Sequence, residues 1–246
     1  MKNYFDNNQH EIFAKYNNIR VLDETDKRIR YLVHEHDSKK LFILSIIRDG
    51  NIKIFNKLAK CDNFNITNFI DIKKIDNNDI VLIEDYFEDA ITLQEHIGTG
   101  ISINDFEDCI LQICDVLIYL KSLKVPIVHN NINANNIIVC TGNVVKLINF
   151  ENATFDGNCK NDIINFGELI NNSGKIYEKR YRKVKDDCFN KYISPNEIQR
   201  GIYNSKRILG IRYAIITIIG VITMIILRVW HVYNRSDRMI NRIIQK

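Results

Sequence analysis

Cysteine and histidine are the residues of this sequence that could carry redox or metal chemistry, so their spacing is the first guide to function. The 246 residues include six cysteines and six histidines. No two cysteines form a CxxC pair, and no cysteine and histidine stand at a zinc-ligand spacing. We therefore expect no metal site and predict buried, reduced thiols at Cys61, Cys109, Cys114, Cys140, Cys159 and Cys188.

A second set of polar residues is rich in amides. His129, Asn131 and Asn136 lie in one segment, and Asn149 and Glu151 lie in the next. An amide cannot accept the proton of a hydroxyl group, so it cannot serve as a general base. Its neutral oxygen is also a poor ligand for Mg²⁺, which prefers carboxylate. These positions disfavour proton transfer and tight Mg²⁺ binding.

Short strands followed by helices must position these side chains. From Phe106 to Leu123 apolar residues recur every three or four positions, which predicts an amphipathic helix facing a core. Strands are predicted where apolar, β-branched runs adjoin polar turns, at Ile29–His34, Leu41–Ile47, Ile80–Glu84, Asn136–Cys140 and Val144–Ile148. This order indicates an α+β chain with a strand-rich first part.

Two of these segments carry a family resemblance. Residues 127–139, IVHNNINANNIIV, resemble the catalytic loop of the protein kinase superfamily, HRDxxxxN followed by a short strand. Residues 145–151, VKLINFE, are similar to the metal-binding DFG strand that follows it. Four further segments match in the right order: the third strand (Lys40–Ile47), the strand and hinge between the lobes (Val81–Leu93), the end of the helix before the loop (Ile118–Lys124) and the start of the central helix (Asn161–Gly167).

The resemblance implies a bilobal α+β fold with a strand-rich N-lobe and a truncated helical C-lobe. The expected divisions are an N-terminal extension at 1–15, a protein-kinase-like domain at 16–205 with its N-lobe at about 16–88 and its C-lobe at about 89–205, a transmembrane helix at 208–232 and a basic tail at 233–246.

The same resemblance shows which kinase positions have changed. Asn131 stands at the catalytic base and Asn149 at the DFG aspartate, whereas His129, Asn136 and Phe150 match the family. Glu151 replaces the DFG glycine, which places a bulky carboxylate beside the phosphates. Because phosphoryl transfer depends on Mg²⁺ held by carboxylates and on an aspartate that orients the acceptor, the resemblance implies impaired catalysis.

The nucleotide side has changed as well. Ser45 stands at the phosphate-binding lysine, and the partner glutamate of that lysine falls near Asn51 in a short segment. Residues 23–28, at the Gly-rich loop, contain no glycine and three acids. Lys27 or Arg28 could replace the missing lysine, as a displaced lysine does in with-no-lysine kinases. We expect no cofactor, weak ATP binding at most and no strong Mg²⁺ site.

About a dozen residues separate Asn149 from Asp162. This distance leaves no room for the activation loop and peptide-docking segment of the family. Asp162 matches the aspartate that braces the catalytic loop, and we expect it to have the same structural role here. Small-molecule kinases share a short segment and an "IDFExA" pattern, to which residues 148–153 are similar, but they keep both aspartates.

The longest apolar run, Tyr213–Leu227, predicts a membrane span. Fifteen residues cover about 22 Å, so flanking residues must extend the run toward the roughly 30 Å hydrocarbon core. Arg212 and Arg228 can snorkel to the headgroups, and Trp230 and Tyr233 fit an interfacial belt. With no apolar signal in the first residues, we expect a single-pass tail anchor with the kinase-like domain facing the cytosol.

Charge argues against a nucleic-acid partner. Residues 206–246 hold eight Lys or Arg and one acid, whereas the remainder holds 26 Lys or Arg and 29 acids. The expected partners are a lipid bilayer and an unknown protein, either an active kinase or its substrate. The sequence thus predicts a membrane-anchored pseudokinase that acts as a binding, scaffolding or regulatory module. Two alternatives stay open: an active atypical protein kinase or small-molecule phosphotransferase using ATP, and a basic tail that recruits anionic lipid by itself.

Overall fold

The structure, a computed structural model, describes residues 11–75 and 78–244. The side chains of Leu209, Arg212 and residues 229–244 lie outside this description. The chain forms two compact units, residues 1–199 and 200–246, and each is described here by itself.

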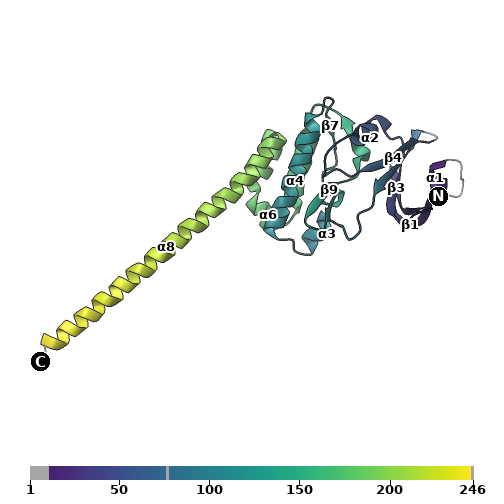
Figure 1. The fold of residues 1–246 in the computed structure, drawn as a ribbon. Coiled ribbons are helices and arrows are strands. Elements are labelled where there is room, and N and C mark those ends of the chain that lie inside the picture. The colour runs from purple at the N-terminus through teal and green to yellow at the C-terminus, as the bar shows by residue number, and fades with distance from the viewer. Residues whose placement is uncertain (1–10, 76–77, 245–246) are drawn as a thin grey trace. The chain divides into compact units, whose positions relative to one another are not determined.

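The first unit begins with a five-stranded antiparallel sheet in the order β1-β2-β3-β5-β4 (Figure 1). The strands are β1 (Tyr16–Glu24), β2 (Arg28–Glu35), β3 (Leu41–Ile47), β4 (Phe69–Lys74) and β5 (Ile80–Asp85). The predictions for β2, β3 and β5 are confirmed to within one residue at each end. The two edge strands β1 and β4 were not predicted, because their sequences mix charged and apolar residues.

One face of this sheet is buried in an apolar core. Alternate residues supply it, such as Tyr31 and Val33 of β2 and Leu44 and Ile46 of β3, as the two-residue period of a strand requires. The short helix α1 (Glu11–Lys15) adds buried Ile12 and Phe13 to the same core. Residues 11–15 of the expected N-terminal extension therefore pack with the sheet, and residues 1–10 lie outside the described chain. Helix α2 (Ile52–Leu58) follows β3.

The second part of this unit is helical, with α4 (Ile103–Ser122) at its centre. Figure 1 shows α4 beside β9 and the helices of this part. The helix buries Phe106, Ile110 and Ile113, as its periodicity predicts. It begins three residues earlier than predicted because the Ser102 side chain caps it, accepting a hydrogen bond from the backbone N–H of Asp105 at 3.1 Å. The other helices are α3 (Leu93–Gly98), α5 (Lys160–Asn172), α6 (Lys175–Arg180) and α7 (Arg182–Lys191).

Short strands connect these helices. The strands β6 (Ile91–Thr92), β8 (Ile137–Cys140) and β9 (Val144–Leu147) form a three-stranded sheet, and β7 (Ile127–Val128) pairs with β10 (Thr154–Phe155). The 3-10 turns η2 (Ala134–Asn136) and η3 (Phe150–Asn152) precede β8 and follow β9. The predicted β8–β9 hairpin is confirmed.

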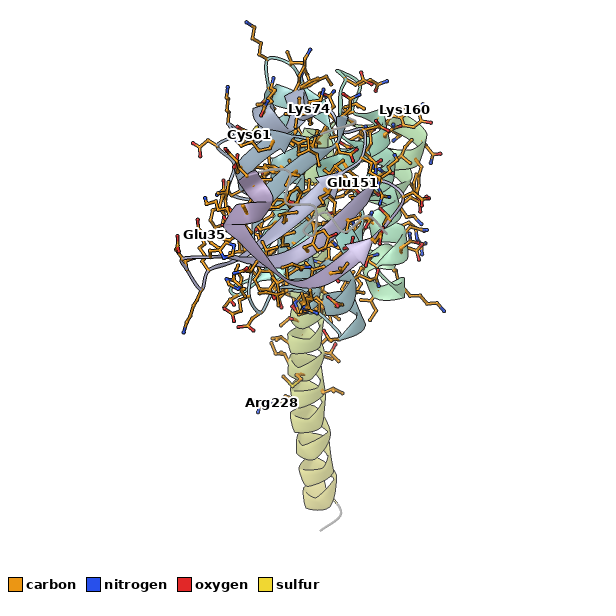
Figure 2. The ribbon with its side chains drawn as sticks, turned by 90° about the vertical axis from the view of Figure 1, so that its right-hand side faces the viewer. Glu35, Cys61, Lys74, Glu151, Lys160 and Arg228 are labelled. Carbon is orange, nitrogen blue, oxygen red and sulfur yellow. The ribbon has the colours of Figure 1, made fainter. Side chains whose placement is uncertain are left out.

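Helix α8 spans Pro195–Ile244 and carries the apolar run. Its residues Tyr213–Leu227 are exposed, as is Arg228, which Figure 2 labels on this helix. The hydroxyls of Thr217 and Thr223 donate to the carbonyls of Tyr213 and Ile219 at 2.9 and 2.8 Å, so both are satisfied within the helix. The part Pro195–Arg228 is long and apolar enough to cross a membrane. The predicted flanking side chains of Arg212, Trp230 and Tyr233 lie outside the described residues.

The cysteines differ partly from the expectation. All six are free thiols. Cys109, Cys114 and Cys188 are buried as predicted, but Cys61, Cys140 and Cys159 are half-buried because they stand at element ends or turns. Burial raises the pKa of Cys109 and of Cys188 to about 12, so these two thiols stay protonated at neutral pH.

Candidate functional site

The loop between β7 and η2 is hydrogen-bonded to the buried side chain of Asp162 on α5. The Asp162 carboxylate accepts hydrogen bonds from the backbone N–H groups of His129 and Asn130, at 2.9 and 2.7 Å. Asp162 is 1% exposed, and burial raises its pKa to about 6 although both hydrogen bonds act to lower it. Asn130 takes a left-handed backbone conformation, φ 62°, which asparagine tolerates well. The geometry is that of the brace predicted for Asp162.

Asparagine side chains of the loop form a hydrogen-bond network with Asn149, which follows β9. Asn149 Nδ2 donates to Asn136 Oδ1 at 2.6 Å, and Asn136 Nδ2 donates to the Asn131 carbonyl at 2.8 Å. The Asn131 side-chain oxygen accepts from Asn133 Nδ2, also at 2.8 Å. Asn149 adopts a left-handed conformation with φ 66°. Three of the predicted positions are thus joined into one network whose oxygens already accept hydrogen bonds.

An aromatic stack connects the sheet with this network. The rings of His129 and Phe150 meet edge to face at 4.6 Å, Phe150 meets Phe69 of β4 at 6.4 Å, and Phe69 meets Phe55 of α2 at 5.8 Å. The His129 Nε2–H points at the Ile148 carbonyl at 3.0 Å, and Nδ1 accepts from the Asn131 N–H at 3.2 Å. His129 and Phe150 are therefore structural partners in the core of the site.

Three basic side chains of the β1–β2 hairpin reach the segment after β9. Arg30 Nη1 donates to Asn149 Oδ1 at 3.2 Å, Arg28 pairs with Glu151 at 2.6 Å, and Lys27 donates to Asn152 Oδ1 at 2.8 Å. Figure 2 labels Glu151 where the purple strands overlap the green helical part. These contacts connect the sheet to the loop region across more than a hundred residues of sequence.

Arg30 is the cation that sequence reasoning missed. It is the register partner of Ser45, and its guanidinium also bonds Asp23 at 2.6 Å. Lys27 and Arg28, which could have replaced the missing lysine, bind Asn152 and Glu151, whereas Arg30 is the basic side chain that contacts Asn149. Burial acts to raise the pKa of Asp23, but hydrogen bonds from Arg30 and the nearby Arg28 hold it below its usual value.

The predicted positions on β3 and α2 have different surroundings. Ser45 is buried, and its hydroxyl donates to Glu84 Oε2 at 2.9 Å. Asn51 is exposed and caps α2, with its side chain accepting from the Lys53 N–H at 3.2 Å. Helix α2 has seven residues, so the segment is short as expected. Asn51 therefore belongs to a helix start and is not among the residues that line the cleft.

A cavity of about 290 Å³ lies between the sheet and the loop region. Its apolar walls include Leu22, Ile43, Ile138 and Ile148. Its polar lining residues are Asp23, Arg30, Thr67, Glu84, Asp85, Tyr86, Thr92, Asn135 and Asn149. The volume is at the lower end of the roughly 300–1,000 Å³ range of small-molecule pockets.

Titration of His129 should be measurable. Burial lowers its pKa to about 4, whereas an unfolded chain takes up the proton near pH 6.5. The unfolded state therefore binds more protons between these values, so the His129 contribution to stability falls as the pH falls from 6.5 to 4. Asp162, with a raised pKa, acts in the opposite sense, because the folded state takes up its proton first.

We predict that the free energy of unfolding of His129→Phe is lower than that of the wild type at pH 7.5, and that this difference becomes smaller at pH 5. The variant keeps an aromatic ring against Phe150 but loses two hydrogen bonds, so it is less stable at pH 7.5. Between pH 7.5 and 5 the wild type loses about 2 kcal/mol that the variant does not lose. Urea unfolding of both chains at the two pH values measures this. A gap that stays constant with pH would contradict a neutral, buried His129.

Comparison with known proteins identifies the fold. No family model matches this chain, and no curated protein matches it. Among solved structures, the kinase domain of PknI from Mycobacterium tuberculosis matches with a TM-score of 0.60 and 13% sequence identity, covering 78% of this chain and 96% of that domain. At this identity the match establishes the fold alone. The chain has a protein-kinase-like α+β fold, with a strand-rich N-terminal sheet and a helical C-terminal part. Among the residues that the structure describes, one apolar helix could span a membrane.

Proposed function

We propose that this chain is a membrane-tethered pseudokinase, in which a catalytically inactive kinase-like domain acts as a binding, scaffolding or regulatory module. The observation that carries the proposal is the amide network of Asn131, Asn136 and Asn149 with Arg30 bound to it. Phosphoryl transfer needs a carboxylate at the position of Asn131 to orient the acceptor hydroxyl and another at the position of Asn149 to hold Mg²⁺.

The residues present do not fit a Mg²⁺ ion. The Asn136 and Asn149 side-chain oxygens are neutral, and both accept hydrogen bonds within the protein. The Arg30 guanidinium, 3.2 Å from Asn149 Oδ1, already donates to the oxygen that a divalent cation would need as a ligand. Mg²⁺ dehydrates reluctantly and is bound through carboxylates, so this donor set offers it little.

The residues at the catalytic-base and phosphate-binding positions are also unsuited to proton transfer and to phosphate binding. The Asn131 side-chain oxygen accepts from Asn133, and an amide cannot take a proton from an attacking hydroxyl. Ser45 supplies no positive charge and is bound to Glu84. The Glu151 carboxylate is bound to Arg28 beside the site. We infer that the domain works through its surface, and that its partner is another protein such as an active kinase or a kinase substrate.

Membrane attachment is the second part of the proposal. The exposed, apolar residues of α8 from 213 to 227 suit a hydrocarbon environment, as do the hydroxyls of Thr217 and Thr223, which are hydrogen-bonded within the helix. We propose a single pass with the kinase-like domain on the cytosolic side.

A thermal-shift titration tests the inactive state. We expect ATP to give no Mg²⁺-dependent rise in the melting temperature of the full chain in a neutral detergent, because a ligand that binds only the folded state must raise its stability. An active kinase treated in parallel serves as the positive control. A Mg²⁺-dependent rise, together with phosphoryl transfer that Asn131→Ala removes, would show instead that the chain is an active, atypical phosphotransferase.

A further inference from the structure

The cavity between the sheet and the loop region keeps the form of a binding site although its phosphate chemistry is gone. Leu22 and Ile43 line it from the sheet, and Ile138 and Ile148 line it from β8 and the end of β9. Tyr86 adds an aromatic ring from the segment after β5. These walls would bury an apolar or aromatic ligand body.

The charges around the cavity are mainly negative. Asp23, Glu84 and Asp85 line it together with a single base, Arg30. The Arg30 guanidinium is bound to Asp23 and to Asn149, so its charge is already compensated. Asp85 lies 3.6 Å from Lys40, whose side chain is 64% exposed, and solvent weakens such a pair. An anionic ligand is therefore disfavoured.

Glu84 is the most informative of these acids. Its Oε2 accepts from the Ser45 hydroxyl, while Oε1 has no hydrogen-bond donor among the residues that the structure describes. Burial raises the pKa of Glu84, although the Ser45 hydrogen bond acts to lower it. A carboxylate that faces a small cavity with one oxygen still available has room for a donor from a ligand, and a cationic donor gives the stronger, charge-assisted bond.

We propose that the cleft binds a small organic cation with a planar, apolar body, with its positive end at Glu84 and Asp85 and its body between the aliphatic walls. Tyr86 would contribute a cation–π contact. The inference rests on the proposed function, because Mg²⁺-ATP would occupy the same cleft in an active kinase. It adds the chemical class of a ligand for that cleft.

Three probes of one shape and different charge test the proposal. Benzamidine is a cation, benzamide is neutral and benzoate is an anion. Thermal unfolding of the full chain in a neutral detergent is measured with each. At ten times its dissociation constant, benzamidine is expected to raise the melting temperature by about 4 °C, with smaller shifts for benzamide and none for benzoate.

Two variants assign the shift to the cleft. Glu84→Gln removes the charge with little change in shape and is expected to abolish the benzamidine shift. Glu88→Gln is the matched control, because Glu88 is exposed and is not among the cavity residues, and it should keep the shift. If Glu84→Gln does not fold, Asp85→Asn is tested in its place. We expect Asp85→Asn to weaken the apparent affinity for benzamidine, derived from the melting-temperature shifts, at least threefold.

The outcomes separate this inference from the proposed function. No benzamidine shift, or an equal shift with benzamide, overturns the cation site but leaves the pseudokinase proposal intact when ATP is also without effect. A Mg²⁺-dependent ATP shift overturns both. A benzamidine shift that persists in Glu84→Gln and in Asp85→Asn places binding elsewhere and overturns the inference as well.

Discussion

Replacing Asp162 with alanine is expected to lower the melting temperature of the kinase-like unit by about 10 °C. The substitution removes the acceptor of two buried backbone hydrogen bonds, from His129 and Asn130. Each hydrogen bond to a charged group contributes about 1.5–3 kcal/mol, and the donors left behind are desolvated. A loss of 3 kcal/mol or more corresponds to roughly 10 °C in a domain of this size. Circular dichroism of the full chain during heating measures it.

Glu168→Ala is the matched control for this experiment. Glu168 lies on the same helix, α5, but is exposed, so its loss should change the melting temperature by no more than about 2 °C. Asp162→Asn keeps one acceptor oxygen, so its melting temperature should lie between those of Asp162→Ala and Glu168→Ala. An unchanged melting temperature in Asp162→Ala would mean that the loop is held by the Asn130 and Asn133 side chains instead, and that Asp162 is not its brace.

The sequence predicted the elements whose local pattern is strong. The runs at β3 and β5 are β-branched and almost wholly apolar, and the run at β2 holds the consecutive apolar residues Tyr31, Leu32 and Val33. These runs form the three central strands of the sheet. The helix α4 followed from its periodicity. The loop at His129 and its carboxylate Asp162 could be predicted as a pair only through the kinase resemblance, because 33 residues separate them.

The cross-sheet contacts could not be predicted, because they depend on strand register and on how the sheet meets the loop region. Arg30 reaches Asn149 across 119 residues of sequence, and Ser45 reaches Glu84 across 39. One signal was present in the sequence: Arg28 and Arg30 alternate on β2, so both must project from the same face. The structure shows that Arg30 contacts Asn149 and that Arg28 contacts Glu151.

Ion pairs and hydrogen bonds of the β1–β2 turn also join the sheet to the loop region. Arg28 with Glu151 and Lys27 with Asn152 join the β1–β2 hairpin to the segment after β9. Arg28 and Glu151 are each only about one-eighth exposed, so their attraction is less screened than that of a surface pair. Cationic side chains of the glycine-free turn thus connect the two parts of the domain.

Two aspartates in the middle of the apolar helix are expected to release the chain from membranes. Ile219 and Ile222 lie near the centre of the stretch 208–232, and both are exposed. Exchanging isoleucine for aspartate at a helix centre costs about 3–4 kcal/mol per position on the insertion scale, so Ile219→Asp with Ile222→Asp costs about 7 kcal/mol. That is enough to change a fully inserted segment into one that is almost entirely excluded. The fraction that resists alkaline carbonate extraction measures the change.

Tyr203→Asp is the matched control, since Tyr203 is an exposed residue of the same helix outside the apolar run. It should leave the extraction-resistant fraction as in the wild type. If the double variant stays membrane-bound, attachment would come from the Lys and Arg residues within 206–246 acting on anionic lipid. Raised salt should then release the chain, because surface attraction of this kind is screened within a Debye length. Resistance of the wild type to high salt, combined with release of the double variant at low salt, is the pattern that a spanning helix requires.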